Sequence, residues 1–261
     1  MGSTGKAGSV ALPTTPQAVT PTGLQEGDSQ DVIQKYYSDN YGITVGGSYF
    51  KANLNTKVLV RASQVLDKLA QELGADTLKA LGVKITSYDQ IDKNAYAQTN
   101  ILNHMIGVNP KMFNSYDGLK AQMHVDVLHG LHPKGAQAAD VLIHEIGHNI
   151  DYLINAKQNN NDMTQMLISY NNQAVSKAIV QAAYAELKSE QPNLYKTEKQ
   201  ARASISSYAD SKVTRLVNGK PSRVTAYSEC LAEAVADYGR NGQNANPMSI
   251  KIWQGIKEML K

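Results

Sequence analysis

The sequence predicts an α+β fold that is mainly helical and contains a small mixed sheet. Several long segments repeat their apolar residues every three to four positions, which is typical of helices packed on one side. Between them lie short segments in which apolar and polar residues alternate, which is typical of strands. No internal repeat is visible. We therefore expect helices, then short strands, then more helices.

The overall composition is that of a globular protein, with 42% hydrophobic and 19% charged residues among 261. The net charge of +3 is small and the lysines are spread out, so we expect no nucleic-acid binding. No apolar stretch approaches the roughly 18 to 20 residues that span a bilayer, so we expect no membrane segment. The N-terminus lacks the apolar core of a secretory signal. The single cysteine, Cys230, excludes an internal disulfide and a cysteine-rich zinc site, and we expect it to be a small buried residue.

Three regions are expected along the chain. Residues 1–28 are rich in Gly, Thr, Pro and Ser, and we interpret them as a flexible leader, tag or linker. Residues 29–95 are predicted to form an N-terminal helical region. Residues 96–261 are predicted to form the domain that carries the chemistry.

The N-terminal region is expected to begin with a short helix after Ser29. Residues 41–50, YGITVGGSYF, indicate a turn or hairpin. A longer helix follows, capped by Asn55 and ended by Gly74, because its apolar residues fall on one face. Residues 83–88 alternate like a strand. The short first helix would bury Val32, Ile33, Tyr36 and Tyr37.

The middle of the chain predicts two more strands and two helices. Residues 101–108 and, more weakly, 122–128 alternate like strands, and either could form the edge of the sheet. Helical patterns follow over about 136–154 and 163–188.

The last part of the chain begins with residues 200–224, which are polar and irregular. A helix is expected over about 226–238. Pro247 then begins a final amphipathic helix. Its inward side would carry Ile250, Trp253, Ile256 and Leu260.

The most informative motif is HEIGH, within VLIHEIGHNI at residues 141–150. On a helix, His144 and His148 project from the same face one turn apart and can bind one metal ion. Glu145 lies close enough to act on a water there, taking its proton and later protonating a leaving amine. HExxH has only three fixed positions and occurs by chance. Here the flanking residues are apolar, and two histidines and a glutamate on a buried helix need a partner. Gly147 would let another element approach closely.

A catalytic zinc ion needs a third protein ligand. The extended pattern HExxHxxGxxH fails, because residue 151 is Asp and residue 154 is Ile. The helix over 226–238 offers Glu229, Glu233 and Asp237 on one stripe. Three carboxylates beside Ala and Leu are expected to meet cations rather than water.

HEIGH followed by ECLAEA resembles the two signatures of the gluzincin zinc metallopeptidases of the anthrax lethal factor and Pro-Pro endopeptidase type. The resemblance implies a zincin-like metallopeptidase domain with an active-site HExxH helix and one zinc ion per chain. It implies that zinc is held by His144, His148 and Glu229. It also implies that Glu145 is the general base and that Glu233 supports a ligand from behind. Which of the two later glutamates binds the metal directly stays open.

The same family places a tyrosine before the second helix, where its hydroxyl stabilises the oxyanion. The local sequence ISSYAD resembles this element and makes Tyr208 the favoured match. Its spacing to Glu229 is longer than in the family, so the intervening residues would be an inserted loop. Tyr227 is the competing candidate.

The segment HPKGAQAADVLIHEIGHNIDY also resembles HExxH regions of phage-associated minor head proteins. We therefore expect a zinc-dependent endopeptidase that acts on a polypeptide, with a phage or host protein as its partner. It would be virion-associated or in the host cytoplasm if phage-encoded, with a secreted effector as another option. The alternative is a non-catalytic virion or injected protein that retains a zincin fold. The intact Glu145 weighs against it, because a structural zinc site does not need that residue.

Three further histidines, His124, His129 and His132, lie within nine residues of one another. They suggest a second metal, but we expect one of them to line the cleft and His132 to shape a turn with Pro133. Asp151 is expected to hydrogen-bond a ligand histidine or to cap a neighbouring element rather than to bind metal.

Overall fold

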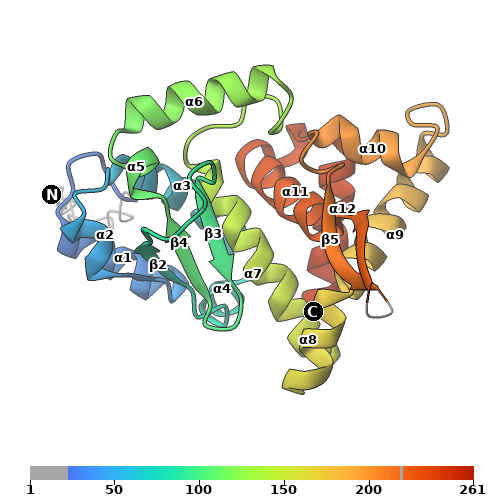
Figure 1. The fold of residues 1–261 in the computed structure, drawn as a ribbon, viewed down its shortest axis with the longest axis horizontal. Coiled ribbons are helices and arrows are strands. Elements are labelled where there is room, and N and C mark those ends of the chain that lie inside the picture. The colour runs from blue at the N-terminus through green and yellow to red at the C-terminus, as the bar shows by residue number, and fades with distance from the viewer. Residues whose placement is uncertain (1–22, 218–219) are drawn as a thin grey trace, which may run out of the picture.

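A computed structural model describes residues 23–217 and 220–261 (Figure 1). The predicted α+β class is confirmed: the described chain is mainly helical, with a four-stranded mixed sheet and a separate two-stranded hairpin. Residues 1–22 of the leader predicted for residues 1–28 lie outside the described residues. Within the described ranges, every helix is too short or too polar to cross a bilayer.

Residues 23–28 are not part of a free leader, which corrects the predicted boundary. Leu24 is buried in the hydrophobic core. The carboxylate of Glu26 forms ion pairs with Lys57 at 3.1 Å and Arg61 at 2.6 Å. These contacts hold the segment against the body of the protein.

The first helix, α1 (Gln30–Tyr41), begins where it was predicted, because the Ser29 hydroxyl accepts a hydrogen bond from the backbone of Val32. It ends at Gly42, whose φ of 62° suits glycine. Val32 was expected to be buried, but it is 48% exposed. The buried residues of α1 are four positions apart: Ile33, Tyr37 and Tyr41.

The predicted hairpin in residues 41–50 is wrong. Strand β1 (Thr44–Val45) is followed by the short helix α2 (Gly47–Lys51). The strand pairs with β2 (Lys84–Ser87), far along the chain, rather than with a neighbour. The predicted long helix is confirmed as α3 (Lys57–Leu73), and it is followed by α4 (Ala75–Lys79).

The main sheet has the strand order β1-β2-β4-β3. Strands β1, β2 and β4 (Met105–Val108) are parallel, and β3 (Ala97–Asn100) runs antiparallel to β4. The predicted strand over 83–88 is confirmed, but only the second half of 101–108 is a strand. Residues 101–104 form a turn that ends at His104, with a φ of 53°. Strand β3, which was not predicted from the sequence, lies at the edge of the sheet because it is last in the strand order.

The predicted strand over 122–128 is also wrong, because these residues end a helix. After α5 (Pro110–Phe113), the helix α6 (Tyr116–Leu128) is capped by the Ser115 hydroxyl. Its buried residues, Leu119 and Met123, are four positions apart. Of the apolar residues that alternate in this stretch, Met123 is buried, whereas Val125 is 43% exposed.

The helix that carries HEIGH is α7 (Asp140–Gln158). The predicted long helix after it is broken into α8 (Met163–Asn171) and α9 (Ala174–Glu190). The break lies at Gln173, which is left-handed with a φ of 54°. Its buried side chain donates to the Thr225 carbonyl at 2.9 Å and accepts from the Ser228 backbone at 3.1 Å. A tertiary contact therefore stabilises a conformation that the local sequence does not require.

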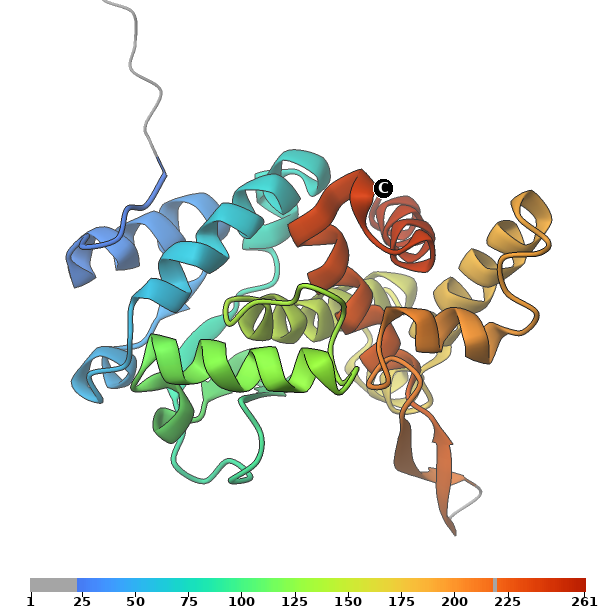
Figure 2. The ribbon, with the colours of Figure 1, turned by 90° about the horizontal axis from the view of Figure 1, so that it is seen from above.

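Residues 200–224, predicted to be irregular, contain most of a helix and a hairpin. Helix α10 (Glu198–Ile205) begins with a capping box. Strands β5 (Lys212–Val217) and β6 (Lys220–Thr225) pair antiparallel and project from the body (Figure 2). The last predicted helices are confirmed as α11 (Tyr227–Asn241) and α12 (Pro247–Leu260), joined by a 3-10 turn at Gly242–Asn244.

One hydrophobic core extends from Leu24 to Leu260. Helix α7 lies at its centre and packs most extensively against α11 (Figures 1 and 2). The division at residue 96 stays a prediction, although β2 and β4, from opposite sides of that boundary, share one sheet. In the final helix, Trp253, Ile256 and Leu260 are buried as predicted, whereas Ile250 is partly exposed.

Candidate metal centre

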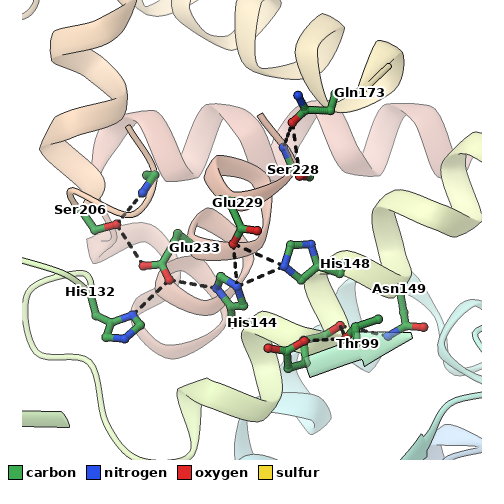
Figure 3. A network of polar contacts seen from close by, with 12 residues as sticks. Thr99, His132, His144, His148, Asn149, Gln173, Ser206, Ser228, Glu229 and Glu233 are labelled. Carbon is green, nitrogen blue, oxygen red and sulfur yellow. Dashed lines mark hydrogen bonds and ion pairs between the residues drawn. The ribbon is translucent and has the colours of Figure 1, made fainter. Parts of the chain in front are cut away.

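The candidate site lies where α7 and α11 pack together (Figure 3). Gly147 permits this approach, as expected: a Cβ atom there would lie 2.8 Å from the Cα atom of Ala232. That distance is far below van der Waals contact, so a side chain would push α11 away. The close packing brings the histidines of α7 next to the carboxylates of α11.

Three side chains converge on one point. The Nε2 atoms of His144 and His148 lie 3.2 Å apart, and Oε2 of Glu229 lies 3.2 Å and 3.5 Å from them. Ligands about 2.1 Å from a tetrahedral zinc ion would be roughly 3.4 Å apart. These residues therefore fit a metal ion, and they are the one such group found in the part of the chain that the structure describes.

The histidines and glutamates of the site favour each other's charged forms. Burial favours the neutral forms, but the carboxylates of Glu229 and Glu233 outweigh it and raise the pKa of His144 well above its usual value. In the same way, burial is outweighed by His148 and His144, and the pKa of Glu229 falls well below its usual range. A metal ion would replace the protons that these groups share, so binding should release protons.

Glu233 lies behind the ligand residues rather than among them. Its Oε1 atom is 2.9 Å from Nδ1 of His144 and 3.1 Å from Nδ1 of His132. The Ser206 hydroxyl donates to Oε2 at 3.1 Å. The group that could hold a metal ion therefore contains Glu229, whereas Glu233 contacts His144 at its other ring nitrogen.

The role of His132 was missed by the sequence analysis, which assigned it to a turn. The available signal was the buried charge of Glu233, which is only 1% exposed and needs a cationic partner. Burial raises the pKa of Glu233, but His132 and His144 outweigh burial and lower it to about 2. The carboxylate is therefore ionised at neutral pH.

Glu145 faces strand β3. Its Oε2 atom accepts a hydrogen bond of 2.6 Å from the Thr99 hydroxyl, and Asn149 donates to its backbone carbonyl at 3.0 Å. The side chain of Glu145 is 7% exposed. Nothing in the polar stretch AQTN marked Thr99, because its contact depends on how the sheet meets α7.

Tyr208 lies beside the histidines, and Tyr227 does not. The ring of Tyr208 stacks on His132 and meets His144 edge-on, with centroid distances of 5.9 Å and 6.3 Å. Burial, and then the nearby glutamates, raise the pKa of the Tyr208 hydroxyl. The ring of Tyr227 instead packs under the Arg202 guanidinium, 5.4 Å away, on the far side of α11. Tyr208, the favoured candidate, therefore lies next to the converging side chains, and its role in a reaction stays a prediction.

An open cleft of about 730 Å³ runs past the three converging side chains. Residues 97–102, which include strand β3, line one side, and Val213 and Arg215 of the hairpin line another. A smaller cavity of about 170 Å³ adjoins it and is mostly apolar. His144, Glu145 and Tyr208 line both spaces.

The other candidates from the sequence have structural roles. His124 and His129 are exposed, and they form no metal-binding group with other described residues. Asp151 is buried and accepts a hydrogen bond of 3.1 Å from Asn155. Asp237 accepts hydrogen bonds from the Asn241 side chain and the Asn246 backbone. Cys230 is fully buried, as expected.

Comparisons with models of protein families, with curated proteins and with solved structures find no match for this chain. Its function is therefore inferred from the residues and geometry of the site.

Proposed function

We propose that this protein is a zinc-dependent endopeptidase. The observation that carries the proposal is the convergence of His144, His148 and Glu229 within 3.5 Å of one another beside the carboxylate of Glu145. These groups line an open cleft that is bordered by the edge strand β3. A purely structural metal site would need neither the cleft nor Glu145.

Zinc is the metal that this set of donors favours. Two imidazole nitrogens and one carboxylate oxygen are typical of catalytic zinc, which keeps a further position open. When bound, zinc polarises a carbonyl and lowers the pKa of water. The order of elements, with an edge strand, the HExxH helix α7 and the acidic helix α11, supports a zincin-like fold of the gluzincin type.

Glu145 acts as the base and then as the acid. Its carboxylate takes a proton from the attacking water as the new C–O bond forms. It then delivers that proton to the amine nitrogen as the C–N bond breaks. The hydrogen bond from Thr99 holds one oxygen of the carboxylate and leaves the other for this proton transfer.

Tyr208 donates a hydrogen bond to the oxyanion that develops on the carbonyl oxygen. Its raised pKa keeps the hydroxyl protonated at neutral pH, as this role requires. The substrate binds as an added strand along β3, because no other strand of residues 23–217 and 220–261 pairs with the outer edge of β3. A polypeptide from a phage or a host stays the predicted substrate.

Replacing Glu145 with Gln tests the proposal. The amide keeps the shape of the side chain but cannot take a proton, so we expect peptide cleavage to fall by about 100- to 10,000-fold. The zinc content should stay near one ion per chain. Cleavage of a peptide library and elemental analysis of the purified protein measure the two quantities.

The matched control is Glu258→Gln, an exposed position on α12 that should cleave like the wild type. If no zinc binds after reconstitution, the proposal is wrong. If zinc binds but the wild type and Glu145→Gln show the same peptide cleavage, or none, a non-catalytic protein with a zincin fold becomes the better interpretation.

A further inference from the structure

The hairpin side of the cleft carries a guanidinium group that has no ion-pair partner among the described residues. Arg215, on β5, lines the cleft together with Glu145, His148 and Glu229. Its Nε atom is buried and has no hydrogen-bond partner among the described residues. The other arginines all have partners: Arg61 with Glu26, Arg202 with Glu198 and Asp210, Arg240 with Asp140, and Arg223 with the carbonyl of Lys212.

The nearest carboxylates of the cleft are already engaged. Glu229 approaches the two histidines, and Glu145 accepts from Thr99. Neither lies within ion-pair distance of Arg215 in the described structure. Among the residues that the structure describes, no other lysine or arginine lines this cleft. Arg215 is therefore a positive charge with free donors, facing the space where a substrate would lie.

A buried donor without a partner is unfavourable, and a bound ligand with an acceptor would relieve it. The planar fork of a guanidinium matches a carboxylate, which can accept two parallel hydrogen bonds. A backbone carbonyl would satisfy only one donor and would leave the charge unpaired. A carboxylate is therefore the ligand that fits the charge and the geometry together.

We propose that Arg215 binds an Asp or Glu side chain of the substrate close to the cleaved bond, so that the enzyme selects acidic peptides. This inference rests on the proposed peptidase function. The adjoining apolar cavity, lined by Tyr96, Met123, Leu131 and Val141, would accept an apolar side chain on the other side of His144 and Glu145. The preferred substrate would then combine an acidic and an apolar residue around one peptide bond.

The register of the hairpin provides a matched control. Arg215 lies opposite Ser222 and Arg223 lies opposite Thr214, so the two arginines project from opposite faces. Arg223 is exposed and does not line the cleft. Arg215→Met and Arg223→Met therefore remove the same charge from the same hairpin on different sides.

The experiment compares the zinc-loaded wild type with both variants on capped peptides that differ only by Glu or Gln at one position. We expect the wild type to prefer Glu by about 10- to 100-fold in kcat/KM, as charged hydrogen bonds allow. Arg215→Met should lose this preference and Arg223→Met should keep it. Arg215→Glu should shift the preference towards Lys. Thermal unfolding checks that each variant is folded.

Two further arms separate the outcomes. If capped Glu and Gln peptides are cleaved equally, but an uncapped C-terminus speeds cleavage by the wild type and not by Arg215→Met, then Arg215 binds a chain end and the proposed selection of acidic side chains is wrong. If the wild type cleaves Glu and Gln peptides equally, or Arg215→Met weakens both equally, the inference is wrong.

If nothing is cleaved, the proposed function fails. In that case, tighter binding of Glu than Gln peptides to the wild type, absent in Arg215→Met, supports the role of Arg215, and equal binding overturns it.

Discussion

At the scale of single residues, the site depends on two carboxylates one helical turn apart with different surroundings. Glu229 is 26% exposed at the cleft, whereas Glu233 is buried and surrounded by His132, His144 and Ser206. The exposed carboxylate can meet an ion, and the buried one can fix the ring of His144. A residue that orients a ligand typically contributes to metal affinity without touching the metal.

Replacing Glu233 with Gln should therefore weaken zinc binding by about 10- to 100-fold. The carboxylate oxygen that contacts both His132 and His144 is charged, whereas the oxygen of an amide is neutral. The variant should therefore hold the imidazole of His144 less firmly in place. Competition for zinc against a chelating dye measures the change.

The control is Asp237→Asn, one turn further along the same stripe, where the carboxylate contacts Asn241 and Asn246 instead of histidines. This variant should keep its zinc affinity even though its thermal stability falls. Equal affinities for Glu233→Gln and the wild type would contradict the supporting role.

At the scale of elements, the crossing of α7 and α11 determines whether the site exists. The two helices touch at Gly147 and Ala232. At their ends, Arg240 of α11 forms a buried ion pair with Asp140 of α7. A close contact in the middle and a pair of charges at the end hold the histidines and glutamates in register.

Gly147→Ala should destabilise the protein by about 1–3 kcal/mol, because the new methyl group overpacks the interface with Ala232. Alanine favours helices by roughly 1 kcal/mol over glycine, so the sign of the result reports which effect is larger. Urea unfolding of the metal-free protein measures it.

Gly118→Ala in α6 is the matched comparison, because its new Cβ atom would meet only the Ser115 side chain, at an ordinary 3.4 Å. It should stabilise the protein by up to about 1 kcal/mol. If both variants gained stability, the interface between α7 and α11 would have room for a methyl group at residue 147, contrary to the prediction.

At the scale of the whole molecule, Glu72 joins the N-terminal and C-terminal halves. From the end of α3, its carboxylate accepts hydrogen bonds from Tyr238 at 2.9 Å, Trp253 at 2.8 Å and Lys257 at 2.9 Å. Burial raises the pKa of Glu72, but these partners outweigh burial and bring it below its ordinary value of 4.5. The ionised carboxylate therefore stabilises the folded protein.

Glu72→Gln should lower the melting temperature at neutral pH. A carboxyl group with a lowered folded pKa contributes its stability above the unfolded pKa, and that contribution is lost as the pH falls through the folded pKa. The difference between wild type and variant should therefore be full above pH 4.5 and shrink at lower pH. Thermal unfolding across this range, on metal-free protein, measures it. A difference that does not depend on pH would show that shape, and not charge, carries the effect.

The sequence alone determined the local features of this protein. Periodicity located α3, α7, α11 and α12, because burying one side of a helix requires apolar residues at helical spacing. The same spacing placed His144 with His148, and Glu229 with Glu233, each pair along one face. Helical geometry relates residues four apart regardless of what surrounds the helix, so such pairs can be predicted without a structure.

Only the tertiary structure decided which of these faces meet. The contacts of Thr99 with Glu145, of His132 with Glu233, and the place of Arg215 in the cleft join residues far apart in the sequence. So does the bend at Gln173, which a distant strand end and helix start stabilise. Such contacts depend on how whole elements pack, and local propensity carries no information about packing partners. The candidate metal ligands could thus be predicted as pairs, but the cleft around them could not.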